Sequence, residues 1–307
     1  MVDYIEAKAL AKLEGFVLDE TLPESPPTLA LDLDTLPCGP DEPPLTGCVV
    51  DAVLAPEECA RLVHAAEQSD AFAFWDASGD RARRSVRNAD TLELNDTAFC
   101  AALWQRLSAF VPQRCSILPE DSQRYEPDLE GEWQAIGLNP HLLINRYAAG
   151  GHFAPHADGS TLVHFNERSL YTVLIYLNDC PDGGATQLLS SACGETSELG
   201  PQGARVARPE AVVHAVRPEC GRALMYYHQV LHAGQMVGRG CTKYCLRTDV
   251  MYTRVDPICT APNDLKAFEL VQQARALEAD GEPMQALPLY MRAAKLSEGI
   301  AKAYRLR

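Results

Sequence analysis

The second half of the chain is a series of short segments rich in β-branched and aromatic residues. Six of these segments occur at 142–147, 170–177, 185–189, 211–216, 222–227 and 243–252. Such residue types are typical of strands, and Gly- and Pro-containing turns separate several of the segments. One domain therefore has to bury many short strands, which favours two packed sheets over a single open one.

Two segments with helical periodicity precede these strands. The first begins near Pro56 and places Leu62, Val63 and Ala66 on one face. The second covers residues 96–110, with Asn95 or Asp96 as the expected N-cap residue. Helices followed by many strands predict an α+β fold, mainly β, in which N-terminal helices buttress a double-sheet jelly roll.

Composition excludes several classes of protein. With 47% hydrophobic and 22% charged residues, the chain reads as a globular protein, and no apolar stretch is long enough to predict a membrane span. The net charge of −15 disfavours nucleic acid as a partner. The N-terminus lacks the pattern of a secretory signal, and the 11 cysteines form no CxxC pair. We therefore expect reduced thiols and a cytoplasmic location, without excluding the nucleus.

The chain divides into three parts. We expect an N-terminal helix and a Pro-rich acidic linker over residues 1–46, a main domain over 47–258, and a helical hairpin over 259–307. The hairpin turn falls at Asp280-Gly281, and Pro288 lies inside the second helix. The hairpin resembles one tetratricopeptide repeat, which is too little to form a stable array. It is expected to pack on the main domain, or to contact a partner or a second copy in a homodimer.

Three side chains have the chemistry of a metal site. His156 and Asp158 are two residues apart, so an extended strand would point both the same way. His232 follows in another strand-rich region. Two imidazoles and one carboxylate form the facial triad that binds non-haem Fe(II) and leaves coordination positions open. The ordinary interpretation, two surface residues and a core histidine, would be preferred for any one of them alone.

The surrounding motifs resemble a known family. The segments NRYAAGGHFAPHADGS, YTVLIYLND, GGATQLL, VLHAG and KYCLRTDVMY occur in the order and at the spacing of the prolyl 4-hydroxylase-like branch of the 2-oxoglutarate and Fe(II)-dependent dioxygenases. The resemblance covers residues 47 to 253. It implies a double-stranded β-helix with the metal ligands at its open end. It also implies Fe(II), 2-oxoglutarate and O2, with ascorbate as a candidate reductant.

The same resemblance implies a cosubstrate site. Lys243 matches the family's basic residue for the distal carboxylate of 2-oxoglutarate, and Arg247 is the reserve candidate on the same strand face. Tyr147 and Tyr176 match positions where a hydroxyl group lies near the iron or the cosubstrate, and Thr172 is a weaker match. Core packing explains each tyrosine equally well.

Four arginines form a basic cluster in an acidic chain. They are Arg81, Arg83, Arg84 and Arg87. A solvated loop is the ordinary interpretation, and the functional one is a lid that recruits an acidic segment of a protein substrate.

These observations predict a dioxygenase that hydroxylates an unactivated C–H bond and releases succinate and CO2. By family analogy the substrate is a prolyl residue of a protein or peptide. A free amino acid or another small molecule is the nearest alternative. A non-catalytic scaffold, which presents the C-terminal hairpin to partners, is the alternative from another class.

Overall fold

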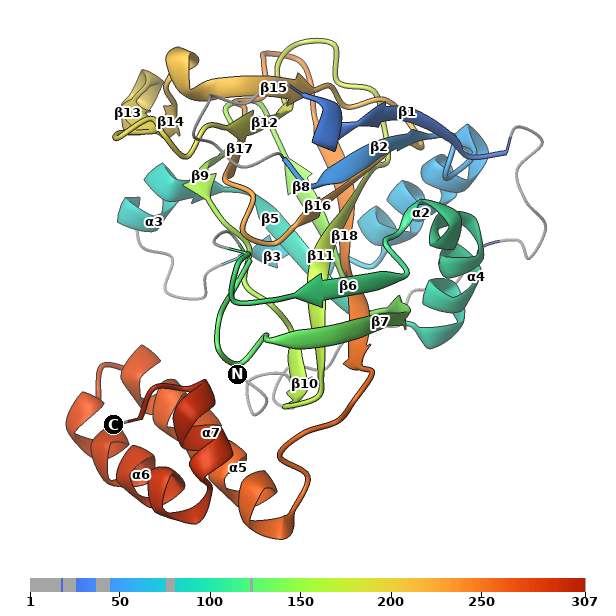
Figure 1. Cartoon of the computed structure of the whole chain (residues 1–307). Helices are drawn as coiled ribbons and strands as arrows, with labels where there is room; N and C mark the ends of the chain where they lie inside the picture. The colour runs from blue at the N-terminus through green and yellow to red at the C-terminus, as the bar shows by residue number, and fades with distance from the viewer. Residues whose placement is uncertain (1–17, 19–25, 37–44, 76–80, 122–123, 307) are drawn as a thin grey trace.

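A computed structural model describes residues 18, 26–36, 45–75, 81–121 and 124–306. The predicted N-terminal helix and part of the predicted linker lie outside this described part of the chain. Within it, strands form two main sheets and a small two-stranded one, and helices cover the larger sheet (Figure 1).

The two predicted helices are confirmed. They are α2 (Pro56–Gln68) and α4 (Thr97–Leu107), the second continued by a 3-10 turn, η2 (Ser108–Phe110). Pro56 occupies the first turn of α2, where its missing N–H costs nothing. The Asp96 carboxylate caps α4 by accepting a hydrogen bond from the amide of Phe99 at 2.9 Å. A buried ion pair between Glu58 and Arg106, at 2.7 Å, joins the two helices.

The larger sheet is antiparallel and has eleven strands, eight of which follow the order β1-β2-β16-β11-β18-β8-β5-β3. Their bounds are β1 (Thr28–Asp32), β2 (Gly47–Asp51), β16 (Ala223–Tyr227), β11 (Glu167–Tyr176), β18 (Lys243–Arg254), β8 (His141–Tyr147), β5 (Asp90–Asn95) and β3 (Ala73–Phe74). The other three are β6 (Arg114–Ile117), β7 (Gly131–Leu138) and β10 (Leu162–His164).

The smaller sheet packs on the larger one through a shared cluster of buried side chains. It has the order β15 (Val212–Val216), β12 (Thr186–Leu189), β17 (His232–Gly234), β9 (His152–His156) and β4 (Arg87–Asn88). A separate hairpin, β13 (Ser197–Leu199) and β14 (Arg205–Ala207), lies beside it, and the short helix α3 (Arg81–Val86) precedes β4. Short 3-10 turns are η1 (Leu33–Thr35), η3 (Pro201–Gly203) and η4 (Pro209–Ala211).

Successive side chains along the strands of the larger sheet point to opposite faces and so belong to two separate hydrophobic cores. Tyr171 and Met225 belong to the cluster that packs toward the helices, whereas Tyr176, Leu224 and Tyr226 belong to the cluster between the sheets. This division follows from the two-residue period of a strand. The predicted α+β, mainly β fold with a jelly-roll core is confirmed.

The predicted linker needs a correction. Part of it, Thr28–Asp32, is strand β1, which pairs with β2 and so extends the larger sheet. The prolines that suggested a linker lie on either side of this strand, and pairing with β2 satisfies its main-chain groups. The three-part division of the chain stays a prediction.

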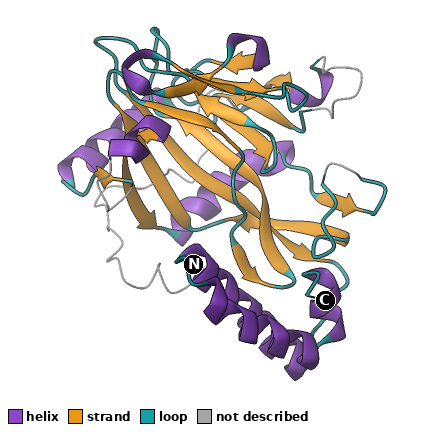
Figure 2. Ribbon diagram, turned by 90° about the vertical axis from the view of Figure 1, so that its left-hand side faces the viewer, coloured by secondary structure: helices purple, strands orange, loops and turns teal. Residues whose placement is uncertain are grey.

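The C-terminal region contains three helices, not two. They are α5 (Pro262–Ala279), α6 (Pro283–Leu296) and α7 (Glu298–Ala303). The hairpin turn falls at Gly281, whose φ of 82° suits glycine. Figure 2 shows these helices at the foot of the sheets, where Phe165 from the β10–β11 turn packs against Phe268 and Tyr304.

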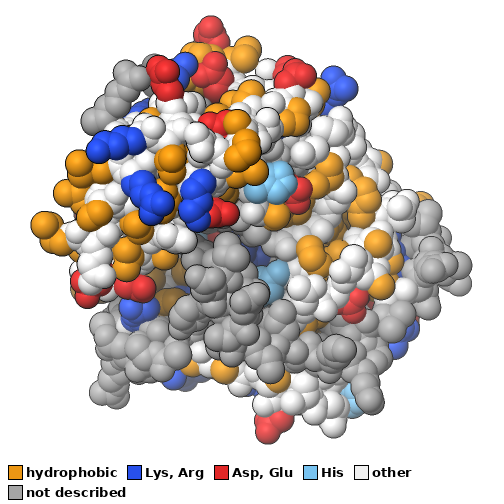
Figure 3. Space-filling view, turned by 90° about the horizontal axis from the view of Figure 1, so that it is seen from below, with side chains coloured by type: hydrophobic (Ala, Val, Ile, Leu, Met, Phe, Trp, Pro, Cys, Tyr) orange, Lys and Arg blue, Asp and Glu red, His pale blue; other side chains and the backbone are white. Residues whose placement is uncertain are grey.

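The surface of the described residues is mixed in character. The face shown in Figure 3 intersperses hydrophobic side chains with charged side chains of both signs. The largest exposed apolar side chains on α6 are Met284, Leu287 and Met291. Among the described residues, no helix combines the length and apolarity needed to cross a membrane.

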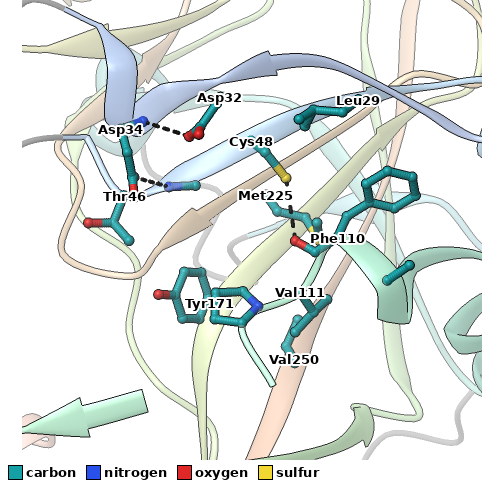
Figure 4. Close-up of a pocket in the computed structure, with 13 residues that line it drawn as sticks. Leu29, Asp32, Asp34, Thr46, Cys48, Phe110, Val111, Tyr171, Met225 and Val250 are labelled. Carbon is teal, nitrogen blue, oxygen red and sulfur yellow. Dashed lines mark hydrogen bonds between the residues drawn. The ribbon is translucent and has the colours of Figure 1, made fainter. Parts of the chain in front are cut away.

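A cavity of about 270 Å³ opens on the helix-facing side of the larger sheet (Figure 4). Tyr171, Met225 and Val250 form part of its apolar floor, and Asp32 and Asp34 lie at its rim. Asp32 accepts a hydrogen bond from the amide of Asp34, and Asp34 accepts one from the amide of Gly47. The two carboxylates thus link the end of β1 to η1, and η1 to the start of β2. The residues with metal-site chemistry line a different pocket, between the sheets.

Candidate metal centre

The three predicted metal ligands converge between the two sheets. His156 ends β9, Asp158 follows two residues later, and His232 begins β17. Strands β9 and β17 pair with His156 directly opposite His232. One ligand atom from each of the three side chains lies within 4.8 Å of the others, and no further such group was found among the described residues. The sheet register therefore positions the group.

Both imidazoles are held in one tautomer. Nδ1 of His156 lies 2.7 Å from the carbonyl oxygen of Ala154, and Nδ1 of His232 lies 2.9 Å from that of Val230. A carbonyl only accepts, so Nδ1 carries the proton and Nε2 keeps its lone pair. Burial, together with the neighbouring His232, lowers the pKa of His156 to about 3, and burial also lowers the pKa of His232. Both rings are therefore neutral at pH 7, as metal binding requires.

Hydrogen bonds fix the carboxylate of Asp158. Its Oδ2 accepts from Thr172 Oγ1 at 2.7 Å and from the Tyr226 hydroxyl at 3.0 Å. Its Oδ1 lies 3.6 Å from the Arg247 guanidinium. Burial alone would raise the pKa of Asp158, but Arg247, the two histidines and the Thr172 hydrogen bond together lower it below its usual value. The group is an ionised carboxylate with Oδ1 available for a metal.

Lys243 supplies a buried cation in the same pocket. It begins β18, is 4% exposed, and lies opposite Tyr147 on β8. Its Nζ is 5.3 Å from the centre of the Tyr147 ring and 5.2 Å from that of the Tyr176 ring. No carboxylate among the described residues pairs with it, and burial lowers its pKa. Lys243 thus offers a buried amino group in the same pocket as the three candidate ligands.

The remaining predicted cosubstrate residues divide into two groups. Tyr147 lines the pocket beside Lys243. The Tyr176 hydroxyl instead donates to Thr186 Oγ1 at 2.8 Å, and Thr172 holds Asp158. Arg247 already pairs with Asp158 and with Asp249 at 3.2 Å. Lys243 is therefore the better anion site, although all of these roles stay predictions.

The sequence did not single out Tyr226 or Phe153. The Tyr226 hydroxyl lies 3.0 Å from both Asp158 Oδ2 and His232 Nε2, and Phe153 stacks on the His156 ring at 3.6 Å between centroids. Tyr226 alternates with Leu224 on a predicted strand, and this spacing could have placed it between the sheets. Phe153 is three residues from His156, and only the observed backbone brings their rings together.

The arginines of the predicted cluster that the structure describes do not all lie on the same surface. Arg83 and Arg84 are exposed on α3, whereas Arg87 is half-buried and lines the pocket of the three candidate ligands. The Arg84 guanidinium lies 4.1 Å from the centre of the Phe74 ring. The side chain of Arg81 lies outside the described part of the chain. Recruitment of an acidic segment by this cluster stays a prediction.

Comparison with known sequences supports the class that this geometry defines. Residues 142–248 match the sequence model of the family described as the 2OG-Fe(II) oxygenase superfamily. The match confirms the predicted resemblance and supports a dioxygenase, and the family implies Fe(II), 2-oxoglutarate and O2. Among curated proteins, none matches the sequence significantly.

Solved structures with some similarity include prolyl hydroxylases and a carbocyclase. A prolyl-4-hydroxylase of Pseudomonas putida is 14% identical, over 69% of this chain and 94% of that one, with a TM-score of 0.42. A Trichoplax adhaerens prolyl hydroxylase, in complex with a hypoxia inducible factor peptide fragment, is 16% identical over 66% and 82%, with a TM-score of 0.41. A carbocyclase of nogalamycin biosynthesis is 13% identical over 69% and 81%, with a TM-score of 0.38. Similarity at this level assigns no substrate.

The residues present fit the implied iron. The donors are the two Nε2 lone pairs of His156 and His232 and one carboxylate oxygen of Asp158. The histidines lie on strands β9 and β17 of the smaller sheet, and Asp158 lies in the loop that follows β9. This donor set suits Fe(II) and leaves room for further ligands. The uncompensated Lys243 fits an anionic cosubstrate beside that metal.

Proposed function

We propose that the protein is an Fe(II)- and 2-oxoglutarate-dependent dioxygenase that hydroxylates a C–H bond, with a prolyl residue of a protein or peptide as the favoured substrate. Overall, one O2 and one 2-oxoglutarate are consumed for each C–H bond converted to C–OH, with release of succinate and CO2. The observation that carries the proposal is the convergence of three neutral or anionic donors beside one unpaired ammonium group.

Each residue has a defined part in this proposal. His156, Asp158 and His232 hold the iron, which when bound supplies the oxygen chemistry. Lys243 holds the distal carboxylate of 2-oxoglutarate, while the other end of that molecule lies at the metal. Thr172 keeps Asp158 in one orientation, and indirect support of this kind strongly affects metal affinity.

The first test is spectroscopic. Under anaerobic conditions, Fe(II) and 2-oxoglutarate should produce a weak visible charge-transfer band with the wild-type protein. The band should be absent in His156→Ala and retained in the control His164→Ala, because the imidazole of His164 is half-exposed and pairs with Glu167. A band of equal intensity in His156→Ala would refute the metal assignment.

The substrate is tested separately. A proteome incubated with the loaded protein and 2-oxoglutarate should contain peptides that gain one oxygen atom on proline. Oxygen gained only by small molecules would favour the free amino acid or small-molecule alternative. Ascorbate as reductant and a cytoplasmic location stay predictions.

The scaffold alternative has one supporting feature. Met284, Leu287 and Met291 are more than half exposed along one side of α6, where a partner could bind. The scaffold hypothesis predicts neither a charge-transfer band nor succinate on aeration. Observation of both would reject it as the whole function.

A further inference from the structure

One arginine in the pocket has no counter-ion among the described residues. Arg87 lines the same pocket as the three candidate ligands, and its Nε is buried without a hydrogen-bond partner. Its terminal NH2 group donates to Thr91 Oγ1 at 3.1 Å and to Asn145 Oδ1 at 2.6 Å, both neutral. Within the described ranges, no carboxylate forms an ion pair with it. A half-buried cation that contacts only neutral groups is poorly compensated.

Several other poorly exposed arginines are compensated differently. Arg106 pairs with Glu58, Arg168 with Asp128, and Arg222 with Asp51. These three arginines thus face acids, whereas the buried Arg254 donates to the main-chain oxygens of Glu130 and Asp128. Arg87 differs from these three, and it lines the pocket of the candidate metal ligands.

The position of Arg87 is fixed relative to the metal ligands. It lies opposite Phe153 in the pairing of β4 with β9, the strand that ends at His156. Its guanidinium carbon is 4.8 Å from the centre of the Phe153 ring, which in turn stacks on the His156 ring. The indole Nε1 of Trp75 donates to the Arg87 carbonyl oxygen at 2.8 Å. A single aromatic ring therefore contacts both the cation and a proposed iron ligand.

A count of charges in the loaded site leaves one cation over. Arg247 is compensated by Asp158 and Asp249. Under the proposed function, one carboxylate of 2-oxoglutarate lies at the metal and the other at Lys243. The histidines are neutral, so nothing in the site pairs with Arg87. One further anionic group would complete the site.

We propose that Arg87 binds a carboxylate of the primary substrate, so that the substrate is an anionic molecule. This inference rests on the proposed function. The contact of Phe153 with both sites suits a substrate whose carboxylate is only a few bonds from the C–H bond that reacts. Either a free amino acid or an acidic group next to the target residue in a peptide supplies this chemistry.

The direct test observes the Arg87 side chain by NMR. The protein is loaded with Zn(II) and 2-oxoglutarate, a complex that cannot turn over. The Arg87 Nε–H signal is the one present in the wild-type spectrum and missing from that of Arg87→Gln. The probes are acetate, L-proline and N-acetyl-aspartyl-prolinamide, with acetamide and L-prolinamide as neutral counterparts. We expect carboxylates to shift this signal and neutral amides to leave it unchanged. If L-proline binds more tightly than the peptide, the substrate is a free amino acid. If the peptide binds more tightly, the substrate carboxylate is an acidic side chain next to the target residue.

Three outcomes would overturn the proposal. The first is an Arg87 signal that no carboxylate shifts at tens of millimolar. The second is equal binding of an acid and its amide. The third is an Arg87→Gln variant with weakened 2-oxoglutarate binding and unchanged probe binding, which would assign Arg87 to the cosubstrate.

A variant series provides the second measurement. In Arg87→Gln, affinity for the best carboxylate probe should fall at least about tenfold, because a charged hydrogen bond is lost. Affinity for 2-oxoglutarate should change less than about twofold, and the exposed control Arg114→Gln should behave as wild type. Full carboxylate affinity retained in Arg87→Gln, with an intact charge-transfer band in the iron-loaded protein, would reject this inference while leaving the proposed function standing. Absence of the band in wild type would reject the proposed function itself.

Discussion

The sharpest prediction concerns Lys243, whose ammonium group is buried and has no acidic partner in the part of the chain that the structure describes. Replacing it with methionine keeps most of the side-chain length and removes the charge. Loss of a charged hydrogen bond to 2-oxoglutarate costs about 1.5–3 kcal/mol, so the Kd should rise about 10- to 150-fold. Titration of the charge-transfer band measures this directly.

The same variant should be more stable than wild type when 2-oxoglutarate is absent. Replacing buried charged groups with apolar ones commonly stabilises by about 1–4 kcal/mol. Loss of the contacts with the Tyr147 and Tyr176 rings offsets about 1–2 kcal/mol of this. A net gain of about 1 kcal/mol would raise Tm by about 2 °C. The control Lys266→Met, at an exposed ion pair, should change stability by less than about 0.5 kcal/mol.

The pH dependence has a definite sign. The pKa of Lys243 is lower in the folded protein than in the unfolded chain, where it is near 10.5. Between these values the unfolded chain binds more protons, so the contribution of Lys243 to stability rises with pH. Lys243→Met should lack this rise. Suppose instead that Lys243→Met is less stable than wild type at pH 7 without cosubstrate. The Lys243 ammonium would then already be compensated in the folded protein, which would refute the argument that it is uncompensated.

Three further predictions concern support around the site and the fold. Thr172→Val and Tyr226→Phe should each weaken metal binding about 10- to 100-fold with the fold intact, and unchanged affinity in both would contradict a role in holding Asp158. Phe165→Ala should cost about 3–5 kcal/mol in unfolding free energy through loss of contacts with the C-terminal helices, and a loss below about 1 kcal/mol would show that they dock elsewhere. Glu58→Ala should cost about 3–5 kcal/mol in urea unfolding because it leaves its arginine partner buried and unpaired, and a neutral effect would show that water compensates it.

Much of the fold could be predicted because its signals are local. Pro56 and Asp96 indicated helix starts, and alternating β-branched residues indicated the strands. Strand β1 was missed, since its short TLALD segment lies among prolines and is defined by pairing with β2. The third C-terminal helix was missed because six residues carry little periodicity.

The site was predictable only in part. The triad could be found because its residue types are rare in combination and their spacing suited two strands. Lys243 and Arg247 could not be separated by sequence, since both point to one face of β18. The structure distinguishes them because Arg247 contacts Asp158 and Asp249. Arg87 looked equivalent to its neighbours until the pairing of β4 with β9 turned it inward.

The carbonyl groups that hold His156 and His232 lie two residues earlier in the chain, one on strand β9 and the other in the turn before β17. Each imidazole is thus oriented by its own backbone, and not by the ion it would bind. Little rearrangement should therefore accompany loading, and metal-depleted protein should keep its fold and regain activity when ferrous iron is restored. Cells short of iron would then hold a reserve of this protein that is inactive yet ready for use.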